Sequence, residues 1–580
     1  MAAVITAFSI ISTCSGISIT VDPEYTVYAG AAFCRKDAVY LSLDGTVPAG
    51  SRKYVISPDS RGIADITAAA ADFAGKSRTP YLVEINFSAD ASGEVYLGVG
   101  AYYFAEAFID GHPVYSMLYQ GNESIDLRPE NNPFKVLVRK GKNRIVFLLH
   151  SAAAGGLISF GQVDTAAAEK YFSHTSYLTH GNPGSVCVNF FSGSPAMAFV
   201  DYRKKGERTS RRAYDISGGQ MRCDRTKHTV LLTGLESDTE YEYRPGIIRF
   251  PETGLYRYEL FDQPQTIYLE KAGFRTFTCA PTKFSMFYTS DIHGMPAQRI
   301  TLLNDFLKNC RAGDADILVS GGDIGKELYD SERVLLHSLT DVLFTGCKKK
   351  PVFVSVRGNH EYRGFESADF QRFFGGKEEK TYYMFRMGEV CFIVLDSGED
   401  KPRQKNFAYY ARHFDRELML EQRKWLEKAV ADEMFTGAKF KVVMIHSSGE
   451  QKYMRENISV ITDGLFTGKD PAHKIHLWLC GHTHHFSRSV SPDGRDVMAQ
   501  EDIAVRNTGA LFSGHGVVLV GGGPTGNKRN NTGSMISFSE NAIKIQSAGR
   551  DGKVFDSFYI MPDGTVKEDF SSLKLVRASQ

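Results

Sequence analysis

The sequence predicts a multidomain protein in which two N-terminal β-sandwiches precede a layered α/β domain. The chain has 580 residues, enough for several hydrophobic cores. Up to about residue 280, short alternating apolar runs are separated by turn residues, a pattern typical of antiparallel sheets. After Pro281, apolar runs alternate with segments of helical periodicity, which is typical of layered α/β domains.

We divide the chain into four segments. Residues 1–20 are a signal segment or a first strand, residues 21–168 form the first sandwich, and residues 169–280 form the second. Residues 281–580 form the α/β domain and end in further β segments. Expected helices in that domain place Ile300, Leu303 and Leu307 on one face, and Leu418, Trp425 and Ala429 on another.

The first sandwich is expected to contain the strands YLVEINF, GEVYLGV, FKVLV and NRIVFLL, with turns at Asp110-Gly111 and at Gly141-Lys142-Asn143. The phrase FIDGHPVY, followed by KVLVRKGKNRIVFLLH, resembles the galactose-binding-like jelly-roll domains attached to many hydrolases. That resemblance implies a carbohydrate partner or a structural spacer, and both interpretations stay open.

The second sandwich is expected from the strands SVCVNFF, AMAFVDYR, HTVLLTGL, TEYEYR and FRTFTCAP. The stretch HTVLLTGLESDTEYEYR, with FRTFTCAP after it, resembles the fibronectin type III-like domain that precedes the catalytic part of purple acid phosphatases. Between the last two strands lies an insertion, residues 245–273, that a minimal sandwich does not need. It either reaches over the active site or fills the surface between domains.

Composition limits the partners of the chain. Sixty-eight basic and sixty-seven acidic residues give a net charge of +1, so no global field would hold nucleic acid or an anionic membrane. The nine cysteines show neither close pairs nor the spacing of a metal site, and we expect no disulfide framework.

The N-terminus, MAAVITAFSIISTCSG, has an apolar stretch of signal-peptide length without the usual preceding basic residues. A cleaved signal, a lipid attached to Cys14 and a plain first strand all remain open, with a lean toward a secreted or periplasmic protein. No later segment is apolar for long enough to span a bilayer, so we expect no transmembrane segment and a soluble mature protein.

Polar side chains follow five of the six strands expected in the α/β domain. The strands are FSMFYTS, ADILVSG, VFVSV, FKVVMI and IHLWLC, while VCFIVLD is the exception. Ligands gather at the carboxyl ends of strands in such sheets, so these side chains are expected to share one pocket. Carboxylate, amide and imidazole donors together suit Mn, Fe or Zn better than Ca or Mg. The side chains at these strand ends that can bind a metal are Asp291, His293, Asp323, Asn359, His360, Glu361, His446, His482 and His484.

The ordered motifs D-x-H, G-D, G-N-H-E, a strand-end His in VMIH, and G-H-x-H resemble the calcineurin-like metallophosphoesterases over about residues 281–525. The resemblance implies two metal ions and hydrolysis of a phosphomonoester or phosphodiester by a hydroxide that bridges them. It assigns one ion to Asp291, His293 and His484, the other to Asn359, His446 and His482, and the bridge to Asp323.

The same resemblance gives His360 a catalytic role as proton or hydrogen-bond donor to the leaving group. Arg357 and Arg363 flank this loop and are candidates for binding substrate oxygens. The third histidine of the GHTHH stretch, His485, is interpreted as a rim residue. Lys326 stands where purple acid phosphatases carry the tyrosine that colours their iron, so the metal site resembles the broader superfamily.

A second hypothesis is a binding protein, in which the sandwiches recognise glycans or a partner and the phosphoesterase domain is inactive. Loss of a ligand would favour it, but all the expected ligands are present. Asp396 and Glu399 are interpreted as cleft or capping residues, not as ligands. Gly521-Gly522-Gly523-Pro524 is interpreted as a turn near the metal edge, because no helix with Lys or Ser/Thr follows it as in a phosphate loop.

Overall fold

The computed structural model of the chain divides into two compact units, Met1–Ser173 and His174–Gln580. Each unit is described by itself. The described residues are 17–30, 32–73, 79–102, 104–116, 127–151, 155–164, 174–180, 184–192, 195–249, 265–269, 275–328, 332–364, 366–402, 413–466, 471–490, 496–499, 516–523 and 531–577.

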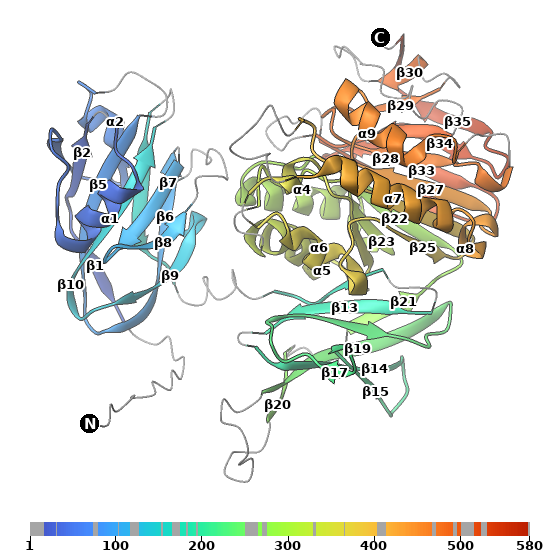
Figure 1. The fold of residues 1–580 in the computed structure, drawn as a ribbon, viewed down its shortest axis with the longest axis horizontal. Coiled ribbons are helices and arrows are strands. Elements are labelled where there is room, and N and C mark those ends of the chain that lie inside the picture. The colour runs from blue at the N-terminus through green and yellow to red at the C-terminus, as the bar shows by residue number, and fades with distance from the viewer. Residues whose placement is uncertain are drawn as a thin grey trace. The chain divides into compact units, whose positions relative to one another are not determined.

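The N-terminal unit consists of two antiparallel sheets packed face to face (Figure 1). One has the order β3-β2-β5-β10-β7-β8, with β1 on β5, and the other has the order β4-β11-β6-β9. The first contains β1 (Ile19–Val21), β2 (Tyr25–Ala29), β3 (Arg52–Ile56), β5 (Pro80–Ala89), β7 (Phe104–Ile109), β8 (His112–Ser116) and β10 (Gly141–His150). The second contains β4 (Ile63–Asp65), β6 (Gly93–Tyr102), β9 (Pro133–Val138) and β11 (Leu157–Gln162).

A helix that the sequence did not suggest lies on this sandwich. Helix α1 (Arg35–Asp44) buries Ala38 and Leu41 against Leu82 and Phe108, on the outer face of the larger sheet. Its apolar residues show little helical periodicity, which is why pattern reading missed it. The other helical turns among the described residues of this unit are α2 (Ile66–Ala69) and the 3₁₀ turn η1 (Pro129–Asn131).

The second unit begins with a β-sandwich that shares a sheet with the α/β layers. One sheet has the order β15-β14-β19-β20, with β21 on β19. The other, β18-β13-β12, continues because β12 pairs in parallel with β24, at Leu178–Val352 and Thr179–Phe353. The strands are β12 (Tyr177–Thr179), β13 (Val186–Phe191), β14 (Met197–Lys204), β15 (Arg211–Tyr214), β18 (Lys227–Leu232), β19 (Thr239–Arg249), β20 (Gln265–Tyr268) and β21 (Arg275–Cys279), with the hairpin β16 (Ile216–Ser217) and β17 (Gln220–Met221) beside them.

Two mixed sheets form the centre of the α/β part. The first runs from β12 through β24-β23-β22-β32-β33-β34-β35, and the second has the order β25-β26-β27-β28-β31-β29-β30-β36. The first contains β22 (Phe284–Thr289), β23 (Ile317–Ser320), β24 (Val352–Ser355), β32 (Thr532–Phe538), β33 (Ile543–Gly549), β34 (Val554–Ile560) and β35 (Val566–Ser571). The second contains β25 (Tyr383–Met387), β26 (Val390–Leu395), β27 (Phe440–Ile445), β28 (Leu477–Cys480), β29 (Ser487–Ser489), β30 (Asp496–Ala499), β31 (Val517–Val520) and β36 (Lys574–Arg577).

Three hydrophobic cores hold these layers together. Met286 and Val354 of the first sheet meet Val442 and Leu479 of the second between the two sheets. Helices α4 (Pro296–Asn309), α5 (Asp341–Gly346) and α6 (Asp369–Phe374), with the π-helix Glu332–Thr340, cover the outer face of the first sheet. Helices α7 (Asp415–Ala429), α8 (Glu433–Thr436) and α9 (Lys452–Thr462) cover the second (Figure 1). The result is a helix–sheet–sheet–helix arrangement.

The fold class predicted from the sequence is confirmed: antiparallel sheets come first and mixed sheets with helices follow. The expected boundaries near residues 168 and 280 stay predictions, as do the jelly-roll and fibronectin type III names. Most of the insertion 245–273 and the N-terminal residues 1–16, with Cys14, lie outside the described residues. Eight cysteines are described, each with a free thiol. Among the described helices, none has the length and apolar character needed to cross a membrane.

Candidate metal centre

Five loops meet at the carboxyl ends of neighbouring strands. Asp291 follows β22, Asp323 follows β23 and Asn359 follows β24, all in the first sheet. His446 follows β27, and His482 and His484 follow β28, in the second. Parallel pairing of β22 with β23 and β24, and of β27 with β28, puts these strand ends on the same side. The buried core between the sheets then brings both sets of loops together.

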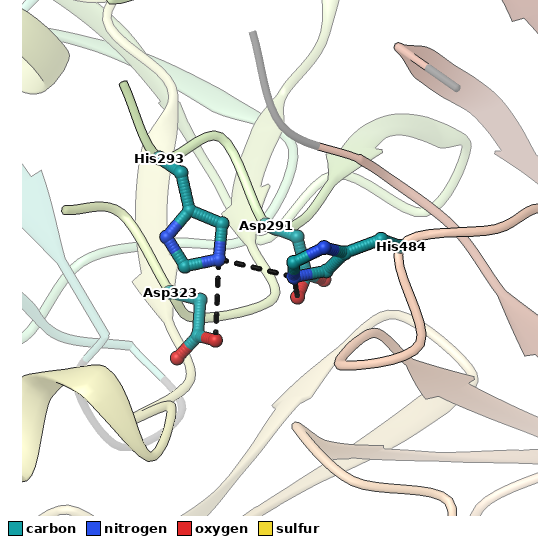
Figure 2. Close-up of side chains that lie close together, drawn as sticks. All are labelled: Asp291, His293, Asp323 and His484. Carbon is teal, nitrogen blue, oxygen red and sulfur yellow. Dashed lines mark hydrogen bonds and ion pairs between the residues drawn. The ribbon is translucent and has the colours of Figure 1, made fainter. Parts of the chain in front are cut away.

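Asp291, His293, Asp323 and His484 form the first cluster (Figure 2). One donor atom from each lies within 4.8 Å of the others. His293 Nε2 is 3.1 Å from His484 Nε2 and 3.4 Å from Asp323 Oδ2, and His484 Nε2 is 3.4 Å from Asp291 Oδ1. Figure 2 shows the two imidazole rings and the two carboxylates directed at a common point.

Asp323, His446 and His482 form the second cluster, and Asn359 lies among them. Asn359 Oδ1 is 3.2 Å from His446 Nε2 and 2.9 Å from His482 Nδ1. His446 Nε2 is also 3.3 Å from Asp323 Oδ2. The same carboxylate oxygen that faces His293 in the first cluster therefore faces His446 in the second.

Backbone carbonyls fix the orientation of two of these imidazoles. His446 Nδ1 lies 2.7 Å from Gly321 O, and His293 Nδ1 lies 3.2 Å from Gly325 O. A carbonyl oxygen can only accept, so each Nδ1 carries the proton and donates it. The Nε2 lone pair of each neutral ring then points into the cluster, the orientation in which histidine binds a metal.

The loops that carry these side chains are held in strained backbone conformations. Among the described residues, ten non-glycine residues have positive φ, and five of them are the candidate ligands Asp291, His293, Asp323, His482 and His484, at 44° to 70°. Such conformations are disfavoured for residues with a Cβ and persist only where surrounding structure enforces them. Half of the non-glycine residues with positive φ in the described chain thus lie at this one site.

Two glycines let the loops approach closely. A Cβ on Gly481 would lie 2.0 Å from Ser290 Oγ and 2.3 Å from Asp291 Oδ2. A Cβ on Gly358 would lie 2.3 Å from Asp323 Oδ1. All three distances are far inside van der Waals contact, so these positions accept no side chain while the carboxylates keep their places.

The structure reveals a buried acid that sequence reasoning did not assign. Glu361 accepts hydrogen bonds from the backbone N–H groups of Asp323, Ile324 and Gly358, at 2.8 to 2.9 Å. It thereby joins the β23 and β24 loops beneath the cluster. The GNHE motif contains this residue, but nothing in the letters reveals that its carboxylate caps a neighbouring loop.

Asp291 is held in a similar way. The backbone N–H of His482 donates to both of its oxygens, at 3.0 and 2.9 Å, and Ser290 Oγ donates to Oδ2 at 2.6 Å. The β22 loop and the β28 loop are thus joined through one carboxylate. Ser290 was part of an expected strand, and its hydroxyl was not singled out.

The pKa values of the clustered side chains show that histidine binds a proton here when no cation is present. Burial lowers the pKa of the His446 imidazole, but the negative charges of Asp323 and Asp291 outweigh burial and raise that pKa to about 10. Burial also opposes ionisation of Asp323, yet the neighbouring His446 and His360 hold the pKa of its carboxyl well below the usual value. Near neutral pH and without metal, His446 therefore carries a positive charge that balances the carboxylates.

Comparison with known families agrees with this geometry. Residues 286–486 match the family model for calcineurin-like phosphoesterases. This segment is a calcineurin-like phosphoesterase domain. It begins in β22 and ends just after the GHTHH stretch, so it includes all seven candidate ligands and His360. No curated protein matches the chain significantly.

Solved structures that match the chain include purple acid phosphatase PPD1 from yellow lupin (Lupinus luteus) seeds, with 14% identity over 84% of this chain and 94% of that chain and a TM-score of 0.49. PhoD has 11% identity over 70% of this chain and 92% of its own, with a TM-score of 0.41. GAP50 of Plasmodium has 13% identity over 50% of this chain and 90% of its own, with a TM-score of 0.30. Similarity of this strength assigns no activity.

Within the phosphoesterase domain, His360 lies at the edge of both clusters. Its backbone N–H donates to Asp323 Oδ1 at 3.0 Å, and its Nε2 is 3.9 Å from Asp323 Oδ2. Nδ1 lies 2.8 Å from the carbonyl oxygen of Lys326, to which it donates. Burial, joined by the positive charge of Arg363, lowers the pKa of His360 to about 3, so the ring is neutral near pH 7.

The two arginines expected to bind substrate are occupied by protein partners. Arg363 is buried and pairs with Glu399 and Asp400 at 2.8 to 3.1 Å, while its Nη1 lies 3.0 Å from the His360 ring nitrogens. Arg357 stacks over the Tyr362 ring at 3.7 Å and donates to the backbone. Their assignment to substrate stays a prediction, and the contacts place Arg363 behind His360.

The other residues singled out from the sequence surround the centre. His485 is partly buried and lies outside both clusters. Gly521, Gly522 and Gly523 follow β31, and Gly523 N donates to Ser290 O beside Asp291, while Pro524 lies outside the described residues. Asp396 and Glu399 are buried in the loop after β26, where Glu399 faces Arg363 and not the clusters.

We predict that metal binding releases protons from the phosphoesterase domain. Because His446 has a pKa of about 10 without metal, it is protonated near neutral pH, and a metal must displace that proton. Metal affinity should therefore rise with pH. Calorimetric titration with Mn²⁺ in buffers of different ionisation enthalpy measures the number of protons released.

His446→Ala should release about one proton fewer than the wild type, whereas the control His112→Ala in the N-terminal unit should match it. A wild-type titration without buffer dependence would contradict the assigned protonation.

Proposed function

We propose that the phosphoesterase domain hydrolyses a phosphate ester, a monoester or a diester, with two metal ions. One ion is assigned to Asp291, His293 and His484, the other to Asn359, His446 and His482. Asp323 is the shared ligand. The observation that carries the proposal is the position of Asp323 Oδ2, 3.4 Å from His293 Nε2 and 3.3 Å from His446 Nε2. One carboxylate oxygen between two sets of donors is what a metal pair requires.

Once the histidines have lost their extra protons, the donor atoms fit cations better than they fit each other. When the histidines are neutral, Nε2 of His293 and Nε2 of His484 are 3.1 Å apart, and the first of them carries a lone pair directed at the second. Asn359 Oδ1 likewise faces His446 Nε2, which has no proton to give when His446 is neutral. Carboxylate, amide and imidazole ligands support Mn, Fe or Zn in both positions.

Bound metal ions would lower the pKa of a water molecule toward neutrality and neutralise the charge on phosphate oxygens. The chain itself prepares their surroundings. His360 N–H occupies Asp323 Oδ1 and leaves Oδ2 for the bridge, and Glu361 keeps the β23 loop in place from below. The chain has a net charge of only +1 and buries the carboxylates of Asp291, Asp323 and Glu361 here, so a phosphate anion needs the positive charge of the ions.

We assign His360 the role of proton donor to the leaving group of the substrate. Its Nδ1–H is engaged with Lys326 O, which directs Nε2 toward the cluster side of the ring. At a pKa of about 3 that nitrogen has no proton of its own. A bound phosphate ester adds negative charge beside the ring, which favours the protonated Nε2 that this role requires.

The alternative, a binding protein with an inactive phosphoesterase domain, receives no support from the site. All seven ligand positions carry donor side chains, and the structure brings them together. Carbohydrate binding by the N-terminal sandwich stays a separate prediction. Metal content, measured with turnover of a panel of aryl phosphates, nucleotides, sugar phosphates and phosphodiesters in Mn²⁺, tests the proposal. A wild-type protein that binds two ions and hydrolyses none of these would favour the alternative.

We predict that Asp323→Asn lowers paired metal occupancy and hydrolysis together. The amide removes the negative charge between two cations, and kcat/KM should fall by on the order of 10³-fold, since the lost stabilisation is several kcal/mol. Metal content by plasma mass spectrometry and kcat/KM are measured on the same preparation.

The matched control for Asp323→Asn is Asp314→Asn, an exposed carboxylate before β23 that pairs only with Arg311 in the described structure. It should keep wild-type metal content and rate. Two tightly bound ions and near-native turnover in Asp323→Asn would refute the bridging assignment.

We predict that His360→Ala lowers kcat/KM most for esters with poor leaving groups. Loss of a general acid costs about 10²-fold to 10⁴-fold where the leaving oxygen needs a proton. Nitrophenyl esters need less help and should lose less. The measurement is kcat/KM across alkyl and aryl esters of graded leaving-group pKa.

Both ions should remain bound in His360→Ala, because Asn359 and not His360 is assigned as the ligand. An equal loss on every ester would place His360 on the phosphoryl oxygens instead, and loss of an ion would make it a ligand.

A further inference from the structure

Glu450 is a buried carboxylate beside the second cluster. It lies in the loop between β27 and α9, four residues after His446, and its side chain is 4% exposed. Glu450 Oε1 is 3.0 Å from His482 Nε2. No Lys or Arg side chain in the described structure forms an ion pair with its carboxylate, and its ion-pair partner there is His482.

His482 is turned the opposite way from the other two oriented histidines. His293 and His446 give Nδ1–H to a backbone carbonyl and turn Nε2 to the cluster. His482 instead turns Nδ1 to the cluster, 2.9 Å from Asn359 Oδ1, and turns Nε2 outward to Glu450. The backbone supplies no carbonyl partner to His482 among the hydrogen bonds described, and a side-chain carboxylate stands in that place.

The side chain of Glu450 is also held by hydrogen bonds within its own loop. Ser447 Oγ and Ser448 Oγ donate to Glu450 Oε2 at 3.2 and 3.1 Å, and Gly449 N donates to Ser447 Oγ. The two shorter bonds fall on Oε2, whereas Oε1 accepts a longer bond from Ser447 Oγ, at 3.4 Å, and lies against the His482 imidazole. Two hydroxyl donors stabilise the ionised form, which can only accept.

We propose that Glu450 is a positioning residue that sets the tautomer of His482 and directs its Nδ1 lone pair at the second metal position. The proposal rests on the proposed dinuclear function. A carboxylate that accepts Nε2–H confines the proton to that nitrogen, and it also makes the opposite nitrogen a better donor to a cation. Without Glu450, the ring is free to carry its proton on Nδ1, where it would block the metal.

This role predicts a selective defect. His482 belongs to the Asn359–His446 side of the pair, whereas His293 and His484 belong to the other side. Loss of Glu450 should therefore lower the affinity for the ion on the His482 side by about 10-fold to 100-fold, the usual effect of removing a carboxylate behind a ligating histidine. The affinity for the other ion should stay nearly unchanged.

The experiment is Mn²⁺ titration of Glu450→Ala, Glu450→Gln and two controls. Glu450→Gln keeps an oxygen that can accept Nε2–H but removes the charge. Its affinity for the ion on the His482 side should therefore fall about 10-fold, less than in Glu450→Ala. Gln451→Ala removes an uncharged neighbour whose Nε2 is 3.2 Å from the same imidazole nitrogen, and it should change affinity less than either. Glu456→Ala, on the exposed side of α9, should match the wild type.

Two readouts separate positioning from general loss of structure. The melting temperature of each metal-free variant reports the fold, and Glu450→Gln should match the wild type. The visible absorption of Co²⁺-loaded protein reports each coordination sphere, and Glu450→Ala should change the bands of one Co²⁺ ion only. Should Glu450→Ala fail to fold, Glu450→Gln alone decides.

Wild-type affinity for both ions in Glu450→Gln, or equal weakening of both ions in a variant with an unchanged melting temperature, would overturn the role of Glu450 while the two-metal proposal stands. A wild-type protein that binds fewer than two ions would overturn the proposed function itself, a distinct result.

Discussion

The arrangement of the centre depends on the buried negative charge of Asp323, which the surrounding side chains must balance. It is 1% exposed, and no Lys or Arg of the described structure pairs with it. An unpaired buried charge is costly, and its ion-pair partners in the described structure are all histidines. Without metal they must hold protons to balance the charge, and with metal the same lone pairs bind cations. The strained loops and the two glycines that admit no Cβ are consequences of packing five loops around this one group.

Much of this arrangement could be predicted from the sequence because it depends on local patterns. Strands β22, β23, β24, β27 and β28 are apolar runs that end at a polar motif, and each motif keeps its place at the strand end. Parallel pairing then brings the strand ends together without further information. Asp291, His293, Asp323, His446, His482 and His484 could therefore be grouped in advance, and the structure groups them.

What the sequence could not predict depends on contacts between distant segments. Glu361 and Glu450 look like ordinary acidic residues in the chain, and their roles appear only when another loop presents an N–H to them. Helix α1 lacks an apolar period, and the pairing of β12 with β24 joins segments more than 170 residues apart at Leu178 and Val352. The pairing of Arg363 with the carboxylates of Glu399 and Asp400 likewise joins separate loops and is not visible in the letters.

The most direct test of the two-metal account is anomalous diffraction from crystals of the Mn²⁺-loaded protein. The account predicts two peaks about 3.5 to 4 Å apart on either side of Asp323 Oδ2. One should lie within bonding distance of His293 and His484, and the other within bonding distance of His446 and His482. A single peak, or a pair that does not share Asp323, would contradict it.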